Sequence, residues 1–243
     1  MKTKLEFISK NHISSDIWQL HFKKPAGFTH VAGQFLQATI PDPHPDERGT
    51  QRWFTISAAP TQKDIIITTR LISGKHSEFK DDLFHLKPGD SIDISGPDGK
   101  FVLPAKNKKL LWIAGGIGVT PFISQMQFLL DSKEFDRDIV LLHGLRSLKE
   151  DPCAELVKKC EAAMPNLHRE VVLSEDIPKG WSGQSGYITA ELIKKVLPDY
   201  LEREVYVSGP EPMVDAMKDM LVKIDVKDEA IHQDWFPGYK EKY

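Results

Sequence analysis

Cysteine is scarce in this sequence, with two residues in a chain of 243. Two thiols are too few for a framework of several disulfides or for the four-cysteine ligand set of an iron–sulfur or structural zinc site. The two residues, Cys153 and Cys160, fall in one stretch that favours a helix, so we expect them to pack in the interior. We expect no metal site in this chain.

Excess positive charge and long apolar runs are also missing. The formal net charge is -3, which gives no reason to expect a nucleic-acid partner. The most apolar stretch, around Leu110 to Ile123, is too short to span a bilayer and contains glycine and proline. No apolar segment follows the lysines at the N-terminus, so we read no signal peptide. With 40% hydrophobic and 28% charged residues, the composition indicates a soluble, cytoplasmic, globular protein.

Residues 1–104 show the pattern of an antiparallel β domain. Apolar and polar residues alternate from Trp18 to Phe22, from Leu36 to Ile40 and from Ile92 to Ile94, and turn-forming clusters separate these runs. Many short strands at this spacing are typical of a β-barrel. One helix is expected in this half, from Ser77 to about Phe84.

Residues 105–243 follow a polar, lysine-rich break and show a different pattern. Strands are expected at 110–114, 138–143, 169–173 and 204–207, and the helices that follow them begin at Pro121, Pro152, Thr189 and Pro212. Strands alternating with helices indicate a parallel sheet covered on both faces. The sequence therefore predicts two domains, a β domain over 1–104 and an α/β domain over 105–243.

The stretch from Leu110 to Met126 combines a buried strand, a glycine turn and the start of a helix. Glycines 115, 116 and 118 allow a sharp turn and place no side chain in the way of a ligand. Thr120 is predicted as the N-cap and Pro121 as the first helical residue. A helix N-terminus at this point has backbone N–H groups that can bind a phosphate. The same pattern also occurs without a ligand, and Pro121 stands where G-x-G-x-x-G has its third glycine.

The string from Gly115 to Pro121, Gly-Gly-x-Gly-x-Thr-Pro, resembles the pyridine-nucleotide loop of the ferredoxin-NADP reductase family. Three more strings resemble motifs of that family, in its order and at similar spacing: Arg52-Trp53-Phe54-Thr55 the flavin motif Arg-x-Tyr-Ser, Gly74-Lys75-His76-Ser77 the loop Gly-x-x-Ser, and Ser208-Gly209-Pro210 with Met213 the motif Cys-Gly-Pro-x-x-Met. The resemblance implies a six-stranded antiparallel flavin-binding barrel followed by a Rossmann-like nucleotide-binding domain.

The first two of these strings would then bind FAD. Arg52 can form a bidentate pair with the diphosphate, Phe54 can lie on the isoalloxazine ring, and Thr55 can hydrogen-bond a ring heteroatom. The family resemblance implies that Gly74, Lys75, His76 and Ser77 hold the pyrophosphate, and that Arg70 corresponds to a basic residue common at that place. Without the resemblance, Arg52 would be read as a rim arginine beside a core aromatic residue and Ser77 as a plain N-cap.

The remaining motifs would bind the nicotinamide nucleotide. The resemblance places Ser208 near the reacting nicotinamide and flavin atoms, with Gly209, Pro210 and Met213 completing its loop. It also implies that an aromatic residue of the C-terminal segment, Trp235 or Phe236, covers the flavin ring. After the third strand, Ser174 precedes Glu175, where NADPH-specific relatives have Ser-Arg. A carboxylate repels a 2′-phosphate and accepts hydrogen bonds from a ribose diol, so NADH is favoured, although Arg146 leaves NADPH open.

The resemblance implies an FAD-dependent NAD(P)H oxidoreductase, in which hydride passes from the nicotinamide to the flavin and Thr55 and Ser208 flank the transfer site. Because this chain has no cysteine cluster, the electrons are expected to leave singly to a separate carrier such as a ferredoxin, a flavodoxin or a haem protein. Two alternatives stay open: a reductase of free flavin, and a non-catalytic FAD-binding regulatory subunit. The acceptor, the working direction and the oligomeric state are not predicted.

Overall fold

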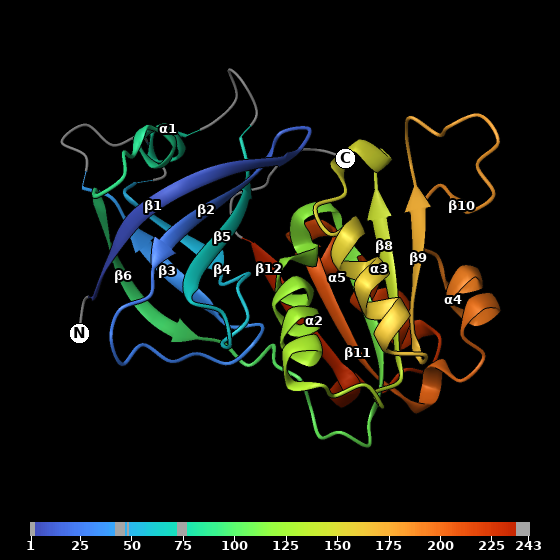
Figure 1. Ribbon diagram of the computed structural model, residues 1–243. Coiled ribbons are helices and arrows are strands. Elements are labelled where there is room, and N and C mark those ends of the chain that lie inside the picture. The colour runs from blue at the N-terminus through green and yellow to red at the C-terminus, as the bar shows by residue number, and fades with distance from the viewer. Residues whose placement is uncertain (1–2, 42–46, 48, 72–76, 237–243) are drawn as a thin grey trace. The chain divides into compact units, whose positions relative to one another are not determined.

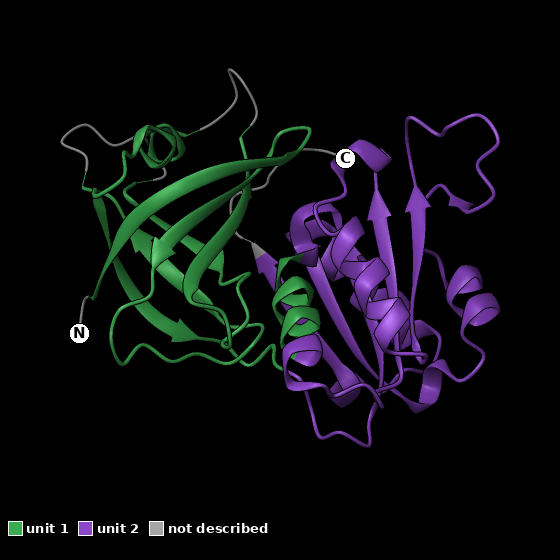
Figure 2. Cartoon of the chain, viewed as in Figure 1, with its two compact units in different colours: residues 1–102, 120–128 green, residues 103–119, 129–243 purple. Residues whose placement is uncertain are grey.

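The structure is a computed structural model, and it describes residues 3–41, 47, 49–71 and 77–236 (Figure 1). The chain divides into two compact units (Figure 2). The first comprises residues 1–102 and 120–128, and the second comprises residues 103–119 and 129–243. The long helix that begins at Thr120 is thus shared between them, with its first nine residues in the first unit.

The first unit is built on an antiparallel sheet of six strands in the order β4-β3-β6-β1-β2-β5. The strands are β1 (Thr3–Ser14), β2 (Ile17–Lys23), β3 (Phe35–Thr39), β4 (Gln51–Thr55), β5 (Asp64–Arg70) and β6 (Ser91–Asp98). Just after β4, the backbone N–H of Ser57 donates to the carbonyl of Ile66 in β5 at 2.9 Å. Because this bond joins the two ends of the sheet order, the sheet curls into the predicted barrel.

Alternating side chains fill the interior of this barrel. In β2, Leu20 and Phe22 are buried while the intervening His21 is only partly covered. The interior includes aromatic pairs such as Phe7 and Phe22, whose ring centroids lie 5.5 Å apart, edge to face. Helix α1 (Glu78–His85) contributes Phe79, Leu83 and Phe84 to the same core, and the side chain of Ser77 caps this helix as predicted.

The second unit is built on a parallel sheet in the order β10-β9-β8-β7-β11-β12. Its strands are β7 (Lys109–Gly115), β8 (Ile139–Leu145), β9 (Leu167–Leu173), β10 (Gln184–Ser185), β11 (Arg203–Pro210) and β12 (Ile231–Phe236). The chain moves outward from β7 to β10 in one direction and then crosses back to β11 on the other side of β7. The order of strands therefore reverses at β7, and in such sheets ligands bind beside the carboxyl ends of the strands at the reversal.

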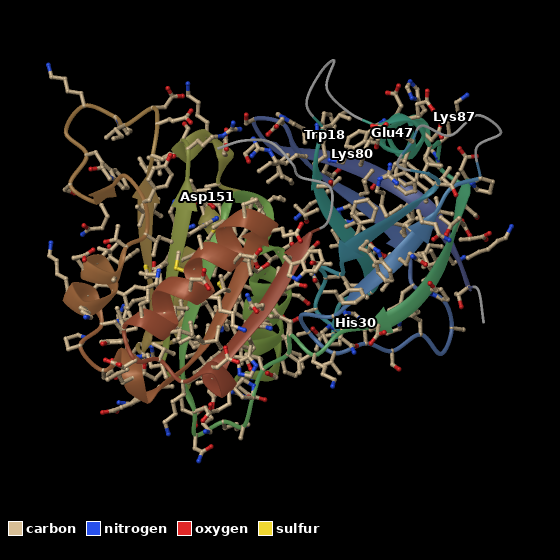
Figure 3. All side chains as sticks on the ribbon, turned by 180° about the vertical axis from the view of Figure 1, so that it is seen from behind. Trp18, His30, Glu47, Lys80, Lys87 and Asp151 are labelled. Atoms are coloured by element: carbon tan, nitrogen blue, oxygen red, sulfur yellow. The ribbon has the colours of Figure 1, made fainter. Side chains whose placement is uncertain are left out.

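Helices cover both faces of this sheet. The helices are α2 (Thr120–Ser132), α3 (Ala154–Ala163), α4 (Ala190–Val196) and α5 (Glu211–Lys223), with short 3-10 turns η1 (Gly116–Val119), η2 (Leu148–Glu150), η3 (Tyr200–Glu202) and η4 (Asp228–Ala230). Helix α3 lies in front of the sheet in Figure 1, whereas α5 lies in front when the molecule is seen from behind in Figure 3. Buried side chains of α4 and α5 pack with Val205 and Val207 of β11 in one core. No helix in the described part of the chain is long and apolar enough to cross a membrane.

The predicted fold class is confirmed, while three local expectations are wrong. Thr120 is the first residue of α2 and Val119 holds the cap position without a side-chain cap, because the 3-10 turn η1 runs directly into the helix. Pro121 consequently lies at the second helical position. Cys153 precedes α3 instead of lying within it. In addition, Trp235 and Phe236 belong to strand β12, which was not among the predicted strands.

Candidate functional site

Two loops meet at the carboxyl ends of the neighbouring strands β7 and β11. The first is the glycine loop, Gly115 to Gly118, and the second is the serine loop, Ser208 to Met213. A Cβ atom on Gly118 would lie 2.4 Å from the carbonyl oxygen of Ser208, and one on Gly115 would lie 2.1 Å from the Met213 sulfur. Side chains at these two positions would therefore collide with the serine loop. The structure brings together residues that lie ninety or more positions apart in the sequence.

This contact gives Gly115 and Gly118 a different role from the one expected from the sequence. The sequence suggested that the glycines keep side chains away from a ligand, whereas Gly115 and Gly118 face the serine loop of their own unit. Gly116 differs, because its φ of +53° is a left-handed conformation that glycine adopts at little cost. The glycine loop is thus a tight 3-10 turn that packs against a second loop, and helix α2 follows it directly in the sequence.

Ser208 lies at the centre of this arrangement. Its side chain is fully buried, and its hydroxyl has no hydrogen-bond partner among the described residues. A buried hydroxyl without a partner is costly, and a ligand that hydrogen-bonds to it would remove this cost. Ser208 pairs in register with Asp234 of β12, so the two side chains lie on the same face of the sheet. Burial raises the pKa of the Asp234 carboxyl to about 7.

The residues expected to select the nucleotide lie side by side at the ends of β8 and β9. The backbone N–H of Glu175 donates to the carbonyl of Arg146 at 3.0 Å, and the N–H of Ser174 donates to that of Leu145 at 2.9 Å. The guanidinium of Arg146 forms an ion pair with Glu150 at 2.9 Å. Glu175 is exposed, so this edge of the sheet presents a negatively charged carboxylate at the surface.

The predicted flavin residues lie on strand β4 of the first unit. The Arg52 guanidinium lies over the ring of Phe79, 5.2 Å from its centroid, and donates to the carbonyls of Gly49 and Gln51 at 2.9 and 2.7 Å. The Phe54 ring stacks on the same Phe79 ring, with centroids 6.0 Å apart and an angle of 29° between the planes. Phe54 is 8% exposed and belongs to the barrel core. Its stacking on a flavin stays a prediction.

Thr55 and Ser77 carry hydroxyls close to these groups in the chain. The Thr55 hydroxyl is buried and, within the described ranges, has no hydrogen-bond partner. The Ser77 hydroxyl accepts a bond from the N–H of Lys80 at 3.3 Å, which fixes the N-terminus of α1. Such an N-terminus provides backbone N–H groups for an anion. The orphaned Thr55 hydroxyl, the Arg52 cation and this helix end fit an FAD molecule with its polar ring edge and its diphosphate.

Arg70 and the segment after it complete the expected flavin group. Both oxygens of Asp16 lie within 3.1 Å of the Arg70 Nε, and the residue is mostly buried. This ion pair ties the end of β5 to the turn between β1 and β2. Gly74, Lys75 and His76 lie outside the described residues, so their predicted contact with a pyrophosphate stays a prediction.

The C-terminal strand places the two candidate aromatic residues beside the serine loop. Trp235 pairs in register with Gly209, and Phe236 with Pro210. Trp235 is 46% exposed, which is unusual for so large an apolar side chain and leaves it available to a planar ligand. That Trp235 or Phe236 covers a flavin stays a prediction.

Two residues of this site, His143 and Asp234, were not predicted from the sequence. His143 is fully buried at the end of β8, and its Nε2 lies 3.0 Å from the Gly116 carbonyl oxygen. A lone histidine in an apolar strand and a lone aspartate near a terminus carry no sequence pattern. Only the register between β11 and β12, and the approach of β8 to the glycine loop, give these residues a place at the site. Figure 3 marks Asp151, which belongs to the same buried group as His143.

Fold and site together define a two-domain oxidoreductase with an FAD-binding domain and an NAD-binding domain. Residues 4–103 match the oxidoreductase FAD-binding domain and residues 112–219 the oxidoreductase NAD-binding domain. The chain belongs to the ferredoxin-NADP reductase family.

Individual relatives agree with this assignment. One subunit of the Na(+)-translocating NADH-quinone reductase of Psychrobacter cryohalolentis is 32% identical over 199 residues, which are 80% of this chain and 47% of that protein. The stachydrine N-demethylase reductase subunit Stc4 of Rhizobium meliloti is 28% identical over 244 residues, covering 98% of this chain and 68% of that protein. This chain thus spans about half the length of several curated relatives that it matches.

The fold also matches solved structures. The cytochrome P450 reductase GcoB of Amycolatopsis superposes with a TM-score of 0.80 and 20% sequence identity, over 96% of this chain and 70% of that one. At this identity the likeness establishes the fold alone.

Proposed function

We propose that this protein is an FAD-dependent NAD(P)H oxidoreductase that passes reducing equivalents from a nicotinamide to its flavin and single electrons onward to a separate carrier. The proposal rests on the meeting of the glycine and serine loops at the sheet reversal. There the buried Ser208 hydroxyl, on β11 between β7 and β12, has no hydrogen-bond partner in the described part of the chain. Neither a scaffold nor a regulatory subunit needs two loops packed in this way at the place where a nucleotide binds.

The residues of the chain position and align, while the cofactors carry the chemistry. A bound FAD would supply the redox chemistry, namely acceptance of two electrons from a reduced nicotinamide and their release one at a time. Arg52 and the N-terminus of α1 bind the diphosphate, and Thr55 offers its hydroxyl to the flavin ring. Ser208 offers its hydroxyl to the nicotinamide. Holding two reactants in contact can supply on the order of 7 kcal/mol of barrier reduction, so alignment is the main contribution of the protein.

NADH is the proposed donor. The edge formed by Ser174 and Glu175 carries an exposed carboxylate, and the Arg146 charge beside it is balanced by Glu150. A 2′-phosphate would meet net negative charge there, whereas a ribose diol can donate hydrogen bonds to the carboxylate.

The proposed acceptor is a small redox protein. Relatives named as reductase subunits of a demethylase and of a glycine betaine monooxygenase support this proposal, since such a subunit delivers its electrons to another protein. With two cysteines in the sequence, this chain cannot itself supply four thiolate ligands to an iron–sulfur cluster.

The test separates a bound-flavin reductase from a reductase of free flavin. The purified protein is passed through a desalting column and assayed with NADH and ferricyanide, without added flavin. We expect a yellow protein that retains about one FAD and reduces ferricyanide. A protein that loses its flavin on the column and oxidises NADH only when free flavin is supplied would contradict the proposal and establish the free-flavin alternative.

A further inference from the structure

The side chain of His143 connects the interior of the second unit to the glycine loop. It lies at the end of β8, fully buried, and its Nε2 atom is 3.0 Å from the carbonyl oxygen of Gly116. Gly116 is the loop residue with a left-handed backbone, which glycine adopts at little cost. The histidine bond ties this carbonyl, at the start of the 3-10 turn η1, to strand β8.

The geometry defines the protonation state of this histidine. Burial lowers its pKa to about 4, against the opposing effect of Asp151, so the ring is neutral near pH 7. A carbonyl oxygen only accepts, so the single ring proton is on Nε2 and points to Gly116. The Nδ1 atom is then an acceptor, and it is buried without a partner among the residues that the structure describes.

A polar cluster packs beside this ring. Asp151 forms a buried ion pair with Arg169 at 2.7 Å, and it accepts a bond from the N–H of Cys153 at 3.0 Å. The Cys153 thiol donates to the same carboxylate at 3.4 Å, and burial raises the pKa of this thiol well above the ordinary value. The cluster therefore anchors the segment after β8, which also carries Arg146, next to the ring of His143.

A metal ion is a weaker explanation for this cluster. Ligand atoms of His143, Asp151 and Cys153 do lie within 4.8 Å of one another. The Arg169 guanidinium, however, is 2.7 Å from the carboxylate and 3.7 Å from the sulfur, so a fixed cation already balances the charge. The protonated thiol would also have to lose its proton before it could bind a metal.

We propose that His143 is a positioning residue for nicotinamide-nucleotide binding, which holds the glycine loop in its binding conformation through the Nε2–H bond to Gly116. The inference rests on the proposed function of that loop. It assigns no contact between His143 and the nucleotide, since the residue acts through the backbone of Gly116.

The experiment compares two substitutions at this position with a matched control. His143→Leu removes the donor at similar volume, and His143→Gln keeps an N–H donor near the place of Nε2. Ile139→Val, at the other end of β8 and also fully buried, controls for a general loss of packing. Hydrogen exchange of the loop amides is measured without nucleotide, and NADH affinity is measured by titration of the FAD-loaded protein.

In His143→Leu we expect faster hydrogen exchange of the amides of residues 115–119 and about tenfold weaker NADH binding. The kcat at saturating NADH and the FAD content should be unchanged. His143→Gln should restore most of the affinity, and Ile139→Val should alter neither loop exchange nor NADH affinity. Unchanged loop exchange in His143→Leu, or faster exchange with unaltered NADH affinity, would overturn the positioning role.

Two further results distinguish a failure of the His143–Gly116 contact from a failure of the proposed function. A wild-type protein that binds neither NADH nor NADPH, yet shows the loop response to His143→Leu, would refute the proposed function and with it the nucleotide role, while the loop contact would stand. If His143→Leu does not fold, nitrogen NMR of the wild-type ring decides: a proton on Nε2 supports the bond to Gly116, and a proton on Nδ1 alone overturns it.

Discussion

At the scale of single residues, the described structure contains buried hydroxyls that its own contacts do not satisfy. Thr55 and Ser208 are both buried without a hydrogen-bond partner in the described ranges, and both belong to predicted cofactor motifs. Thr55 ends β4, and Ser208 lies two residues before the end of β11. An unmade hydrogen bond costs about 1–3 kcal/mol, so residues of this kind are kept where a ligand compensates for them. Both residues belong to motifs that resemble cofactor-binding motifs, and a cofactor hydrogen bond at either hydroxyl would remove this cost.

Arg52→Ala is predicted to weaken FAD binding by about 30-fold, since a hydrogen-bonded charge contributes about 2 kcal/mol. Bound FAD is measured by absorbance after dialysis against a series of FAD concentrations. Lys63→Ala, which removes an exposed positive charge from the same unit, is the control and should retain FAD. Full retention by Arg52→Ala would remove this residue from the cofactor site.

Glu175→Arg is predicted to shift the preference toward NADPH by roughly tenfold, because an arginine attracts the 2′-phosphate that the carboxylate repels. The ratio of kcat/KM for the two nucleotides is the measurement. Asp219→Arg changes the charge by the same amount on the exposed side of α5 and should leave the ratio unaltered. An equal ratio in Glu175→Arg and wild type would place the ribose elsewhere.

Asp234 makes stability depend on pH. Its pKa is raised from 3.8 to about 7 by burial, so the folded state binds a proton more tightly than the unfolded state. Its contribution to stability is full below pH 4 and is lost as the pH rises through 7. Asp234→Asn has no such loss, so its gain in Tm over wild type should be larger at pH 8 than at pH 5. The same Tm difference at both pH values would show that Asp234 titrates normally.

At the scale of elements, the glycine and serine loops behave as one packed unit. A Cβ on Gly118 would have three backbone atoms of the serine loop within 2.7 Å, whereas a Cβ on Gly144, in the neighbouring strand β8, would have ordinary contacts at 3.6 Å or more. Both glycines belong to the second unit, and neither has a positive φ. Because neither position requires a left-handed backbone, alanine substitutions at Gly118 and Gly144 differ only in how closely the new Cβ approaches its neighbours.

Gly118→Ala is predicted to push the two loops apart, to lower the free energy of unfolding by about 2 kcal/mol and to weaken NADH binding. Gly144→Ala is predicted to change neither by more than about 0.5 kcal/mol. Denaturant unfolding and NADH titration of both variants test the pair. Equal behaviour of the two variants would contradict the close packing of the loops.

Much of this element structure could be predicted from the sequence, because the determinants are local. The alternation in β2 and the apolar run in β7 produce a strand in almost any context, and Ser77 caps its helix by reaching three residues ahead. Strand β12 was missed because His232, Gln233 and Asp234 interrupt its apolar pattern, and its pairing with β11 is a long-range contact. The cap at Thr120 failed because a local rule does not detect a preceding 3-10 turn.

The parts of the candidate site that are continuous sequence motifs could be predicted from the sequence. Contacts between residues far apart in the sequence could not. The glycine and serine loops were each recognised, but their mutual packing required the neighbouring positions of β7 and β11 in the sheet. His143 reaches Gly116 across 27 positions of the chain, and nothing in the sequence marks that pairing.

At the scale of the whole molecule, an FAD-binding domain and an NAD-binding domain occupy one chain of 243 residues. Each has its own sheet and its own core, one antiparallel and one parallel. The proposed reaction requires both, since the predicted flavin residues lie in one domain and the predicted nucleotide loops in the other. Loss of either cofactor should therefore abolish the transfer of electrons.

The most direct test of the proposed reaction is an anaerobic titration of the purified, FAD-loaded protein with NADH and, in parallel, with NADPH, followed by visible absorption. We predict that a tightly bound flavin band is bleached by about one equivalent of NADH, and by NADPH only at higher concentration. A protein that stays colourless after incubation with FAD, or a bound flavin that neither nucleotide bleaches, would contradict this prediction.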